Sequence, residues 1–240
     1  MELANSPRAR KIGGGPTSNR RGSSDAAVRV LTDPLRSLRD ASADFEYYRN
    51  QTIFNEGDAA RYTYVVISGG VRLSKIRRNG RRQIVRFLLP GDMFGLECED
   101  EHSLSAEALC DTMIARCGRS DVNRLSRDAS VLSHEIMRRA QRELASMRDH
   151  LVMLGRHTAT EKVAAFLLLL NRPDGAASSN KLELPMGRQD IADFLGLTIE
   201  TVCRELTLLT QNGTIEIPSR HQIVLVNLTR LKIAREGCET

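Results

Sequence analysis

Apolar residues follow two different periods along this chain, and the change between them divides it. From Phe45 to about Arg119, short apolar runs alternate with turn residues. From about Ser120 onwards, apolar positions recur at steps of three and four. The first pattern is typical of short β-strands and the second of amphipathic helices. The chain is therefore predicted to be an α+β protein in which a strand-rich domain comes before the helices.

The strand-rich region is punctuated by glycines at Gly57, Gly69, Gly80 and Gly91. Asn79-Gly80 between two apolar runs is a strong hairpin signal, and we expect a type I′ turn there, which needs positive φ at both residues. Many short strands joined by glycine turns indicate a sandwich or barrel. The expected strands include Thr63–Ile67, Val71–Ile76, Gln83–Leu88 and Thr112–Ala115.

A long helix is predicted over residues 128–156. Its apolar stripe runs for about 23 residues, or roughly 35 Å. A stripe of that length must be covered, and a second copy of the same helix is the simplest cover, in a parallel coiled coil. The alternative is that the helix packs on its own β domain. The predicted dimerisation stripe consists of Leu132, Ile136, Ala140, Leu144, Met147, Leu151 and Leu154.

The last part of the chain reads as a compact helical domain with a hairpin. Thr158-x-x-Glu161 has the form of a capping box at the start of a helix. Two further helices are predicted within residues 187–211, separated by a tight turn at Gly196, with Thr198 capping the second. Their buried positions are predicted at Ile191, Ala192, Leu195, Val202, Leu206 and Leu209. A short strand over Lys181–Pro185 and a hairpin wing with strands Gly213–Ile217 and Gln222–Val226 complete the domain.

Two helices with this turn form a helix-turn-helix, whose second helix reads bases in the major groove with its first turns. Arg204 can give two hydrogen bonds to guanine, and Glu200 can accept from cytosine or orient Arg204. We therefore predict that Glu200, Cys203 and Arg204 read bases; the alternative is an ordinary exposed ion pair between Glu200 and Arg204. The DNA backbone contacts are predicted at Arg188, Gln189, Thr198, Thr201 and, at the wing tip, Arg220.

Composition narrows the class of protein. The chain has 240 residues and a net charge of +5, which permits nucleic acid as a partner. It has no long apolar run and no secretory signal pattern, and its five cysteines form no C-x-x-C. We therefore expect a cytoplasmic protein without a membrane span. Common catalytic motifs are missing, so an enzyme is not expected. Residues 1–30, rich in Arg, Gly and Ser, are predicted to be a disordered basic arm.

The order of these parts resembles the CRP/FNR superfamily of bacterial transcription regulators over about residues 45–230. The most specific stretches are Arg188–Ala192, Leu195–Thr198 and Glu200–Arg204. Glu200-x-x-Cys203-Arg204 is similar to the Glu-x-x-Ser-Arg of the FNR branch and its FixK-like members, and Ile199 stands where the CRP branch has another base-reading Arg.

The resemblance implies a cyclic-nucleotide-binding-like β-roll over 31–127, a dimerisation helix over 128–156 and a winged helix-turn-helix over 157–240. It implies a homodimer on double-stranded DNA, at a palindrome of the TTGA…TCAA type, with recognition helices about 34 Å apart. It also implies contact with RNA polymerase, and we expect activation of transcription.

Three departures from the family bear on sensing. Leu104-Ser105 stands where cyclic-AMP receptors hold the phosphate with Arg-Ser, and Glu97 alone cannot make that site. An iron–sulfur cluster needs four thiolates, but no cysteine precedes Cys98 and the central position falls near Ala115. His102 is read as a polar loop residue rather than a haem ligand. No cofactor or small-molecule effector is expected, although a cyclic-nucleotide-gated regulator remains the alternative within the family.

Cys203 offers one way in which an oxidant could control DNA binding directly. It lies near a helix N-terminus and a cation, both of which favour the thiolate, and oxidation would add charge or bulk on the groove-facing side. We hypothesise that oxidation of Cys203 stops DNA binding; the alternative is that a small residue merely fits there. Two alternatives from other classes are a regulatory β-roll subunit of an enzyme and a scaffold that does not bind DNA.

Overall fold

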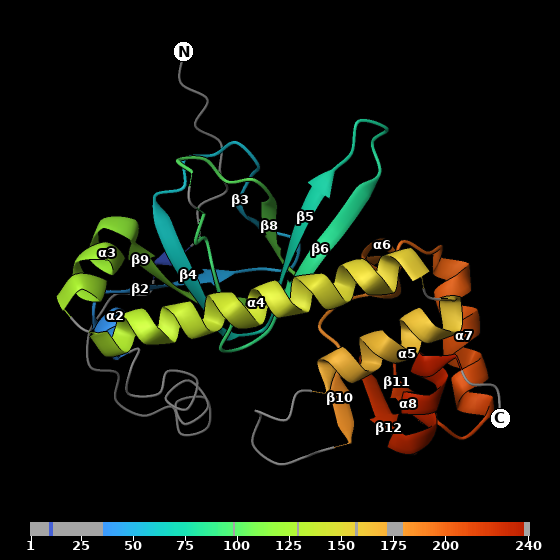
Figure 1. The fold of residues 1–240 in the computed structure, drawn as a ribbon. Helices are drawn as coiled ribbons and strands as arrows, with labels where there is room; N and C mark the ends of the chain where they lie inside the picture. Colours follow the sequence, from blue (N-terminus) through green and yellow to red (C-terminus); the bar gives the residue numbers. More distant parts are fainter. Residues whose placement is uncertain are drawn as a thin grey trace. The chain divides into compact units, whose positions relative to one another are not determined.

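The computed structural model describes residues 10–11, 36–97, 99–128, 130–156, 158–171 and 180–237 (Figure 1). The chain divides into two compact units, Met1–Arg142 and Glu143–Thr240. The predicted α+β order, with strands first, is confirmed. The elements of the first unit are β1 (Arg10–Lys11), α2 (Arg36–Asp40), β2 (Ala43–Tyr47), β3 (Thr52–Phe54), β4 (Tyr62–Ser68), β5 (Val71–Ile76), β6 (Arg82–Leu88), β7 (Met93–Phe94), β8 (Ser105–Ala108), β9 (Thr112–Gly118) and α3 (Arg119–Asp128).

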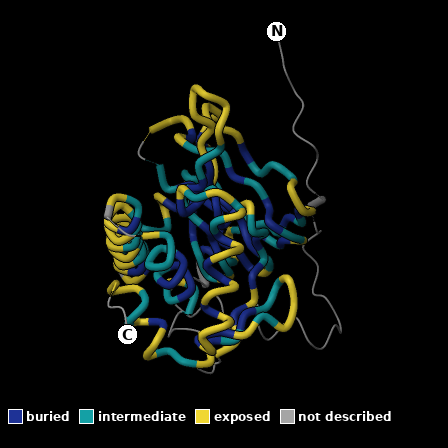
Figure 2. The backbone as a smooth tube through the Cα atoms, turned by 90° about the vertical axis from the view of Figure 1, so that its right-hand side faces the viewer, coloured by how far each residue is buried: buried dark blue, intermediate teal, exposed yellow. Residues whose placement is uncertain are grey.

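The first unit is a β-roll made of two antiparallel sheets. One sheet has the strand order β1-β2-β9-β4-β7 and the other β3-β8-β5-β6. The four strands expected from the sequence are all present, and β5 has the predicted bounds. Residues from both sheets form one buried cluster, so the core lies between the sheets. Figure 2 colours each residue by its burial and shows buried residues gathered in the interior, with exposed residues in the outer loops.

The turn between β5 and β6 differs from the expected one. The hairpin itself is confirmed, with Ile76 paired to Arg82. Gly80 has a φ of 76°, but Asn79 does not have positive φ, so the turn is not type I′. The amide of Gly80 donates to the carbonyl of Arg77 at 2.9 Å. A hydrogen-bonded turn followed by one left-handed glycine is the geometry of a longer hairpin loop, in which a type I turn is followed by a glycine that forms a β-bulge.

Strand β4 is buried on both faces, which explains its continuous apolar run. Tyr64 and Val66 point into the core between the sheets. Val65 and Ile67 alternate with them and pack in a second cluster with residues of α2, α3 and the long helix. Helices therefore cover the outer face of the larger sheet, and a strand in that position needs apolar residues at every step.

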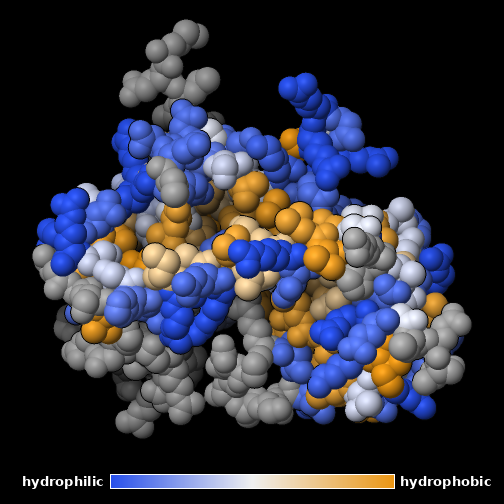
Figure 3. Space-filling model, in the orientation of Figure 1, coloured by the Kyte–Doolittle hydropathy of each residue, from blue (hydrophilic) through white to orange (hydrophobic). Residues whose placement is uncertain are grey.

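The long helix α4 (Ser130–Arg156) has two different apolar faces. Leu132 is 1% exposed and Ile136 packs beside it in the outer cluster of the β-roll. Leu132 and Ile136, the first two residues of the predicted dimerisation stripe, therefore pack on their own domain, and the prediction is wrong for these two residues. By contrast, Met137, Leu144 and Leu151 are 59%, 50% and 70% exposed. Hydrophobic and hydrophilic residues are interspersed on the face of the molecule that Figure 3 shows.

The second unit contains the predicted helices and wing. The capping box is confirmed: Thr158 accepts from the amide of Glu161, whose carboxylate accepts from the amide of Thr158. Helix α5 packs against α7 and α8, and α6 against α7. The elements are α5 (Ala159–Leu170), β10 (Lys181–Glu183), α6 (Arg188–Leu195), α7 (Ile199–Gln211), β11 (Ile215–Ser219), β12 (Gln222–Leu225) and α8 (Leu228–Glu236), with β10, β12 and β11 in one sheet.

The basic arm predicted over residues 1–30 lies outside the described residues except for one short strand. Arg10 and Lys11 form β1 and pair with Glu46 and Phe45 of β2, so these two residues are not disordered as expected. A two-residue strand at a sheet edge is beyond what composition alone can indicate. Across the described residues, none of the helices combines the length and the apolar character that crossing a membrane requires.

Candidate nucleic-acid interface

The junction between α6 and α7 is a tight turn fixed by one glycine. Gly196 has a φ of 65°, a left-handed conformation that favours glycine. The amide of Leu197 donates to the carbonyl of Ala192 at 3.0 Å, which closes the end of α6. At the other end of α6, the carboxylate of Asp190 accepts from the amide of Gly187 at 3.0 Å. The turn and both helix ends thus follow from local sequence.

Helix α7 begins at a threonine cap and buries one stripe. The hydroxyl of Thr198 accepts from the amide of Thr201 at 3.3 Å, as the sequence predicted. Val202, Leu206 and Leu209 are buried, also as predicted. Glu205 is buried beside them, only 4% exposed, and sequence reasoning missed it. Its spacing, three residues after Val202, places Glu205 on the buried stripe and could have indicated its burial. A carboxylate, however, is normally expected at the protein surface.

The opposite face of α7 presents the three residues expected to read bases. Glu200, Cys203 and Arg204 are all exposed and lie in the first two turns. Hydrogen bonds from its own backbone N–H and from the Thr198 hydroxyl lower the pKa of Glu200, so this carboxylate is ionised at neutral pH. Arg204 forms an ion pair with Glu205, with Nε to Oε1 at 3.3 Å, and the Glu200–Arg204 pair considered as the alternative to base reading is not among the ion pairs of the described residues.

Two of the residues expected at the DNA backbone, Arg188 and Arg220, are linked electrostatically to each other, and Arg188 also to Cys203 of this face. Arg188 is partly buried, and burial, assisted by the positive charge of Arg220, lowers the pKa of its guanidinium, while Cys203 acts in the opposite direction. These three side chains are therefore electrostatic neighbours. Gln189 is exposed and donates from Nε2 to Asp193 at 2.8 Å. Arg220 is exposed at the tip between β11 and β12, a shorter tip than predicted because Pro218 and Ser219 belong to β11.

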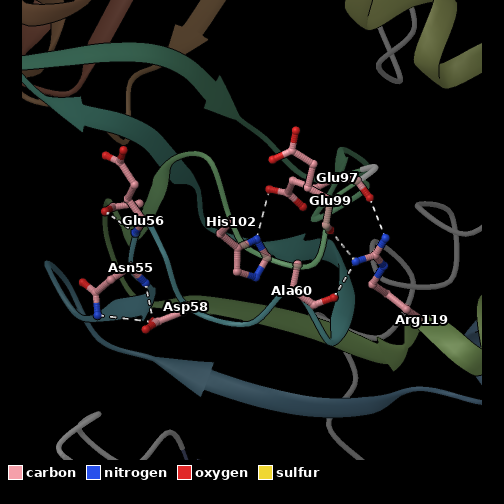
Figure 4. Close-up of polar contacts among 9 residues, drawn as sticks. Asn55, Glu56, Asp58, Ala60, Glu97, Glu99, His102 and Arg119 are labelled. Carbon is pink, nitrogen blue, oxygen red and sulfur yellow. Dashed lines mark hydrogen bonds and ion pairs between the residues drawn. The ribbon is translucent and has the colours of Figure 1, made fainter.

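The β-roll holds a polar cluster that includes Glu97 and His102, two of the residues discussed above for a sensor site (Figure 4). His102 is 2% exposed, lies 3.0 Å from Oε1 of Glu97 through Nδ1, and stacks on Phe54 with ring centroids 3.5 Å apart. Leu104 packs against the core between the sheets. The hydroxyl of Ser105 accepts from the amide of Glu56 at 3.0 Å. Each of these side chains thus already has a contact within the β-roll itself.

Fold and site together define a class of protein, a DNA-binding transcription regulator with an N-terminal β-roll. Two family models match the chain. The cyclic nucleotide-binding domain matches residues 44–128, and the Crp-like helix-turn-helix domain matches residues 161–233. The chain belongs to the CRP/FNR family of transcription regulators and resembles its FixK-type members.

Similar proteins support the same assignment. The nitrogen fixation regulation protein FixK of Azorhizobium caulinodans is 42% identical over 189 residues, 78% of this chain and 76% of that protein. The transcriptional activatory protein AadR of Rhodopseudomonas palustris is 39% identical over 175 residues, 71% of this chain and 72% of that protein. The solved structure of FixK2 from Bradyrhizobium japonicum has a TM-score of 0.76 and 39% identity, covering 82% of this chain and 99% of that one. These relatives are regulators and not enzymes.

Proposed function

We propose that this protein is a homodimeric activator that binds a palindrome of the TTGA…TCAA type with one α7 in each half-site. The observation that carries the proposal is the exposed face of α7, where Glu200, Cys203 and Arg204 stand opposite the buried stripe. In a helix-turn-helix, side chains at that place reach the base edges of the major groove. Contact with RNA polymerase at promoters is part of the proposal, as activation requires it.

The chemistry of the face suits base reading. The guanidinium of Arg204 can give two parallel hydrogen bonds to O6 and N7 of guanine. The ionised carboxylate of Glu200 can accept from N4 of cytosine. One guanine and one cytosine on opposite strands of each half-site would be read by two side chains one helical turn apart, which fits a TTGA half-site and its complement.

Phosphate contacts would fix the register of α7 on the duplex. Thr198 and Thr201 stand at the helix N-terminus, where the helix dipole favours an anion. Arg188 of α6 and Arg220 of the wing are electrostatically linked to each other, and Arg188 also to Cys203 of this face, and Gln189 is exposed next to Arg188 in the sequence. Such contacts add affinity without sequence preference. Changing any of the five should therefore weaken binding to all duplexes alike.

The dimer is proposed to form through an exposed seam of α4, consisting of Met137, Ala140, Leu144, Met147 and Leu151. The steps between these residues are three, four, three and four, the spacing of a coiled coil. Three of the five are at least half exposed in the single chain, which is costly for large apolar side chains. A second copy of α4 would cover them. Leu154, the last member of the predicted stripe, lies by Gly196 of its own chain.

Regulation is proposed at Cys203. The thiol is exposed, and it is an electrostatic neighbour of the Arg188 guanidinium. The sulfur of a Cys203 thiolate would attack one oxygen of hydrogen peroxide, the O–O bond would break, and the products would be a sulfenic acid and hydroxide. Further oxidation or a mixed disulfide would place charge or bulk on the groove-facing side of α7, and the dimer would leave its DNA.

The decisive experiment is selection of bound sequences from random duplex DNA by reduced, full-length protein at a fixed salt concentration. The expected result is enrichment of a two-fold symmetric site. Arg204→Ala should lose roughly 1–3 kcal/mol of discrimination at one base pair per half-site, whereas Arg235→Ala, an exposed arginine of α8, should change nothing. Equal binding of the palindrome and of a scrambled duplex by wild-type protein contradicts the proposal.

A further inference from the structure

Glu205 is a charged residue in the buried stripe of the recognition helix, and both of its oxygens have partners. Oε2 accepts from the hydroxyl of Thr160 at 2.7 Å, and Oε1 accepts from Nε of Arg204 at 3.3 Å. A buried carboxylate is costly unless its oxygens are hydrogen-bonded. The two partners have different surroundings, because Thr160 is half-buried in α5 whereas the side chain of Arg204 is 66% exposed.

The carboxylate is held from a helix other than its own. Thr160 lies in the first turn of α5, which packs against α7. The short Thr160 bond fixes one oxygen of Glu205, and the planar carboxylate then directs the other oxygen towards the surface of α7. The direction in which Oε1 points is thus set by the packing of two helices rather than by the solvent.

The contact with Arg204 uses one defined donor. Arginine has donors at Nε and at two terminal nitrogens, in one plane. When Nε is held by Glu205, the two terminal nitrogens remain as a forward-facing fork, which is a geometry for binding O6 and N7 of guanine. A free arginine side chain has up to about 2 kcal/mol of rotamer entropy to lose when it is ordered. A partner that restricts Arg204 beforehand reduces that loss.

We propose that Glu205, anchored by Thr160, is a positioning residue that orients Arg204 for base reading. The inference rests on the proposed function, because it requires Arg204 to contact a base. Glu205 touches no DNA itself. It acts on specificity at the single base pair that Arg204 reads, and the rest of the half-site does not depend on it.

The test is a set of dissociation constants for a panel of duplexes in which each base pair of the half-site is changed in turn. Five variants of the full-length protein are compared with wild type: Arg204→Ala, Glu205→Met, the double variant that carries both of these changes, Thr160→Val and Thr160→Ser. Methionine keeps the length of Glu205 without an acceptor, and valine keeps the shape of Thr160 without a donor. Serine keeps the hydroxyl. The readout is the ratio between correct and changed duplexes, which the folded fraction of a variant does not alter.

Arg204→Ala is expected to abolish discrimination at one base pair. Glu205→Met should reduce discrimination at that same pair by roughly 2- to 10-fold, the lower part of the range of couplings between contacting residues, and leave the other pairs unchanged. Thr160→Val should act in the same way but less strongly, and Thr160→Ser should restore the wild-type ratio. Glu205→Met should add nothing in a chain that already carries Arg204→Ala.

The possible failures are distinct. If Arg204→Ala leaves discrimination intact at every pair, base reading by Arg204 fails, and the proposed function fails with it. A second outcome is that Arg204→Ala abolishes discrimination at one base pair, but Glu205→Met weakens binding to all duplexes by the same factor. A third is that Glu205→Met still weakens binding to all duplexes in a chain that already carries Arg204→Ala. In either case Glu205 only supports the fold, and the positioning role is overturned. If Glu205→Met does not fold, Thr160→Val decides: an unchanged ratio at the Arg204 base pair overturns the proposal.

Discussion

The ring of His150 lies flat on the ring of Phe194, with centroids 4.0 Å apart and planes 12° from parallel. Nε2 of the same imidazole is 3.0 Å from the carbonyl oxygen of Phe194, so it donates there. These contacts join the C-terminal half of α4 to α6 within the second unit. The helix that carries the proposed seam is therefore also part of the scaffold of the helix-turn-helix.

Replacement of His150 should loosen that attachment. His150→Ala loses a stacked aromatic contact and a hydrogen bond, which together contribute about 1–2 kcal/mol. We expect a lower midpoint of thermal unfolding. His134→Ala, which removes an exposed histidine of the same helix, is the matched control and should leave the midpoint unchanged. Equal midpoints for the two variants would mean that the stacking is incidental.

Gly196 should tolerate no side chain. Gly196→Ala places a Cβ on a left-handed residue, at a cost of about 1–2 kcal/mol. Gly155 provides the matched control, because it is helical and a Cβ there meets nothing within 4 Å. Gly155→Ala should stabilise the protein by about 0.5–1 kcal/mol. Denaturant titration of both variants measures the two changes in unfolding free energy, which should have opposite signs. A Gly196→Ala protein as stable as wild type would contradict the strain argument.

The buried carboxylate of Glu135 should contribute stability that depends on pH. Burial alone would raise its pKa, but hydrogen bonds from Arg138 and Arg139 outweigh burial and lower it. A lowered folded-state pKa means that the contribution is present above the ordinary pKa of a glutamate and is lost as the pH falls through the folded value.

Glu135→Gln should therefore lower the unfolding midpoint at pH 7, and the difference from wild type should shrink on acidification below about pH 4. Glu216→Gln, at an exposed position of β11, should show no such difference at any pH. A gap between Glu135→Gln and wild type that stays constant down to pH 3 would show that the two arginines do not stabilise the ionised form.

The seam of α4 predicts a specific loss of assembly. Leu144→Glu places a charge at the centre of the seam, and we expect dissociation to monomers at micromolar concentration, measured by sedimentation equilibrium. Val152→Glu is the control, because Val152 is 57% exposed on the same helix but lies outside the seam. Dissociation by both variants, or by neither, would place the interface elsewhere.

Oxidation should act through one cysteine. Peroxide is expected to abolish DNA binding by wild-type protein in a gel shift, while Cys203→Ser should remain bound. Cys110→Ser, which changes a half-buried cysteine of the β-roll, should remain sensitive. The more deeply buried Cys117 is protected in another way, because burial raises the pKa of its thiol. Loss of binding in Cys203→Ser equal to that of wild type would end the redox hypothesis.

Local signals predicted most of the fold. The bounds of β5, the capping box at Thr158 and the left-handed end of α6 at Gly196 all depend on residues within a few positions of one another, and these are the features that came out as expected. The turn at Asn79-Gly80 was wrong in type but right in place, because one glycine satisfies several hairpin turns.

Features set by tertiary contacts were not predictable in the same way. Periodicity placed Leu132 and Leu144 on one stripe, although the first is buried on the β-roll and the second is exposed. A hydropathy pattern does not say which neighbour covers which part of a helix. It also treats Glu205 as a surface residue, because the hydroxyl of Thr160 that makes its burial acceptable is 45 residues away in the chain.

The backbone conformation at Gly196 also has a consequence for which residues can be substituted: the glycine of the turn cannot change, whereas the exposed side chains of α7 can. The turn between α6 and α7 is fixed by a residue that has no side chain. Side chains on the outer surface of α7 can therefore be exchanged without disturbing the turn that presents them. Descendants of this chain could acquire new target sequences through a few substitutions on that surface, while the left-handed glycine stays constant.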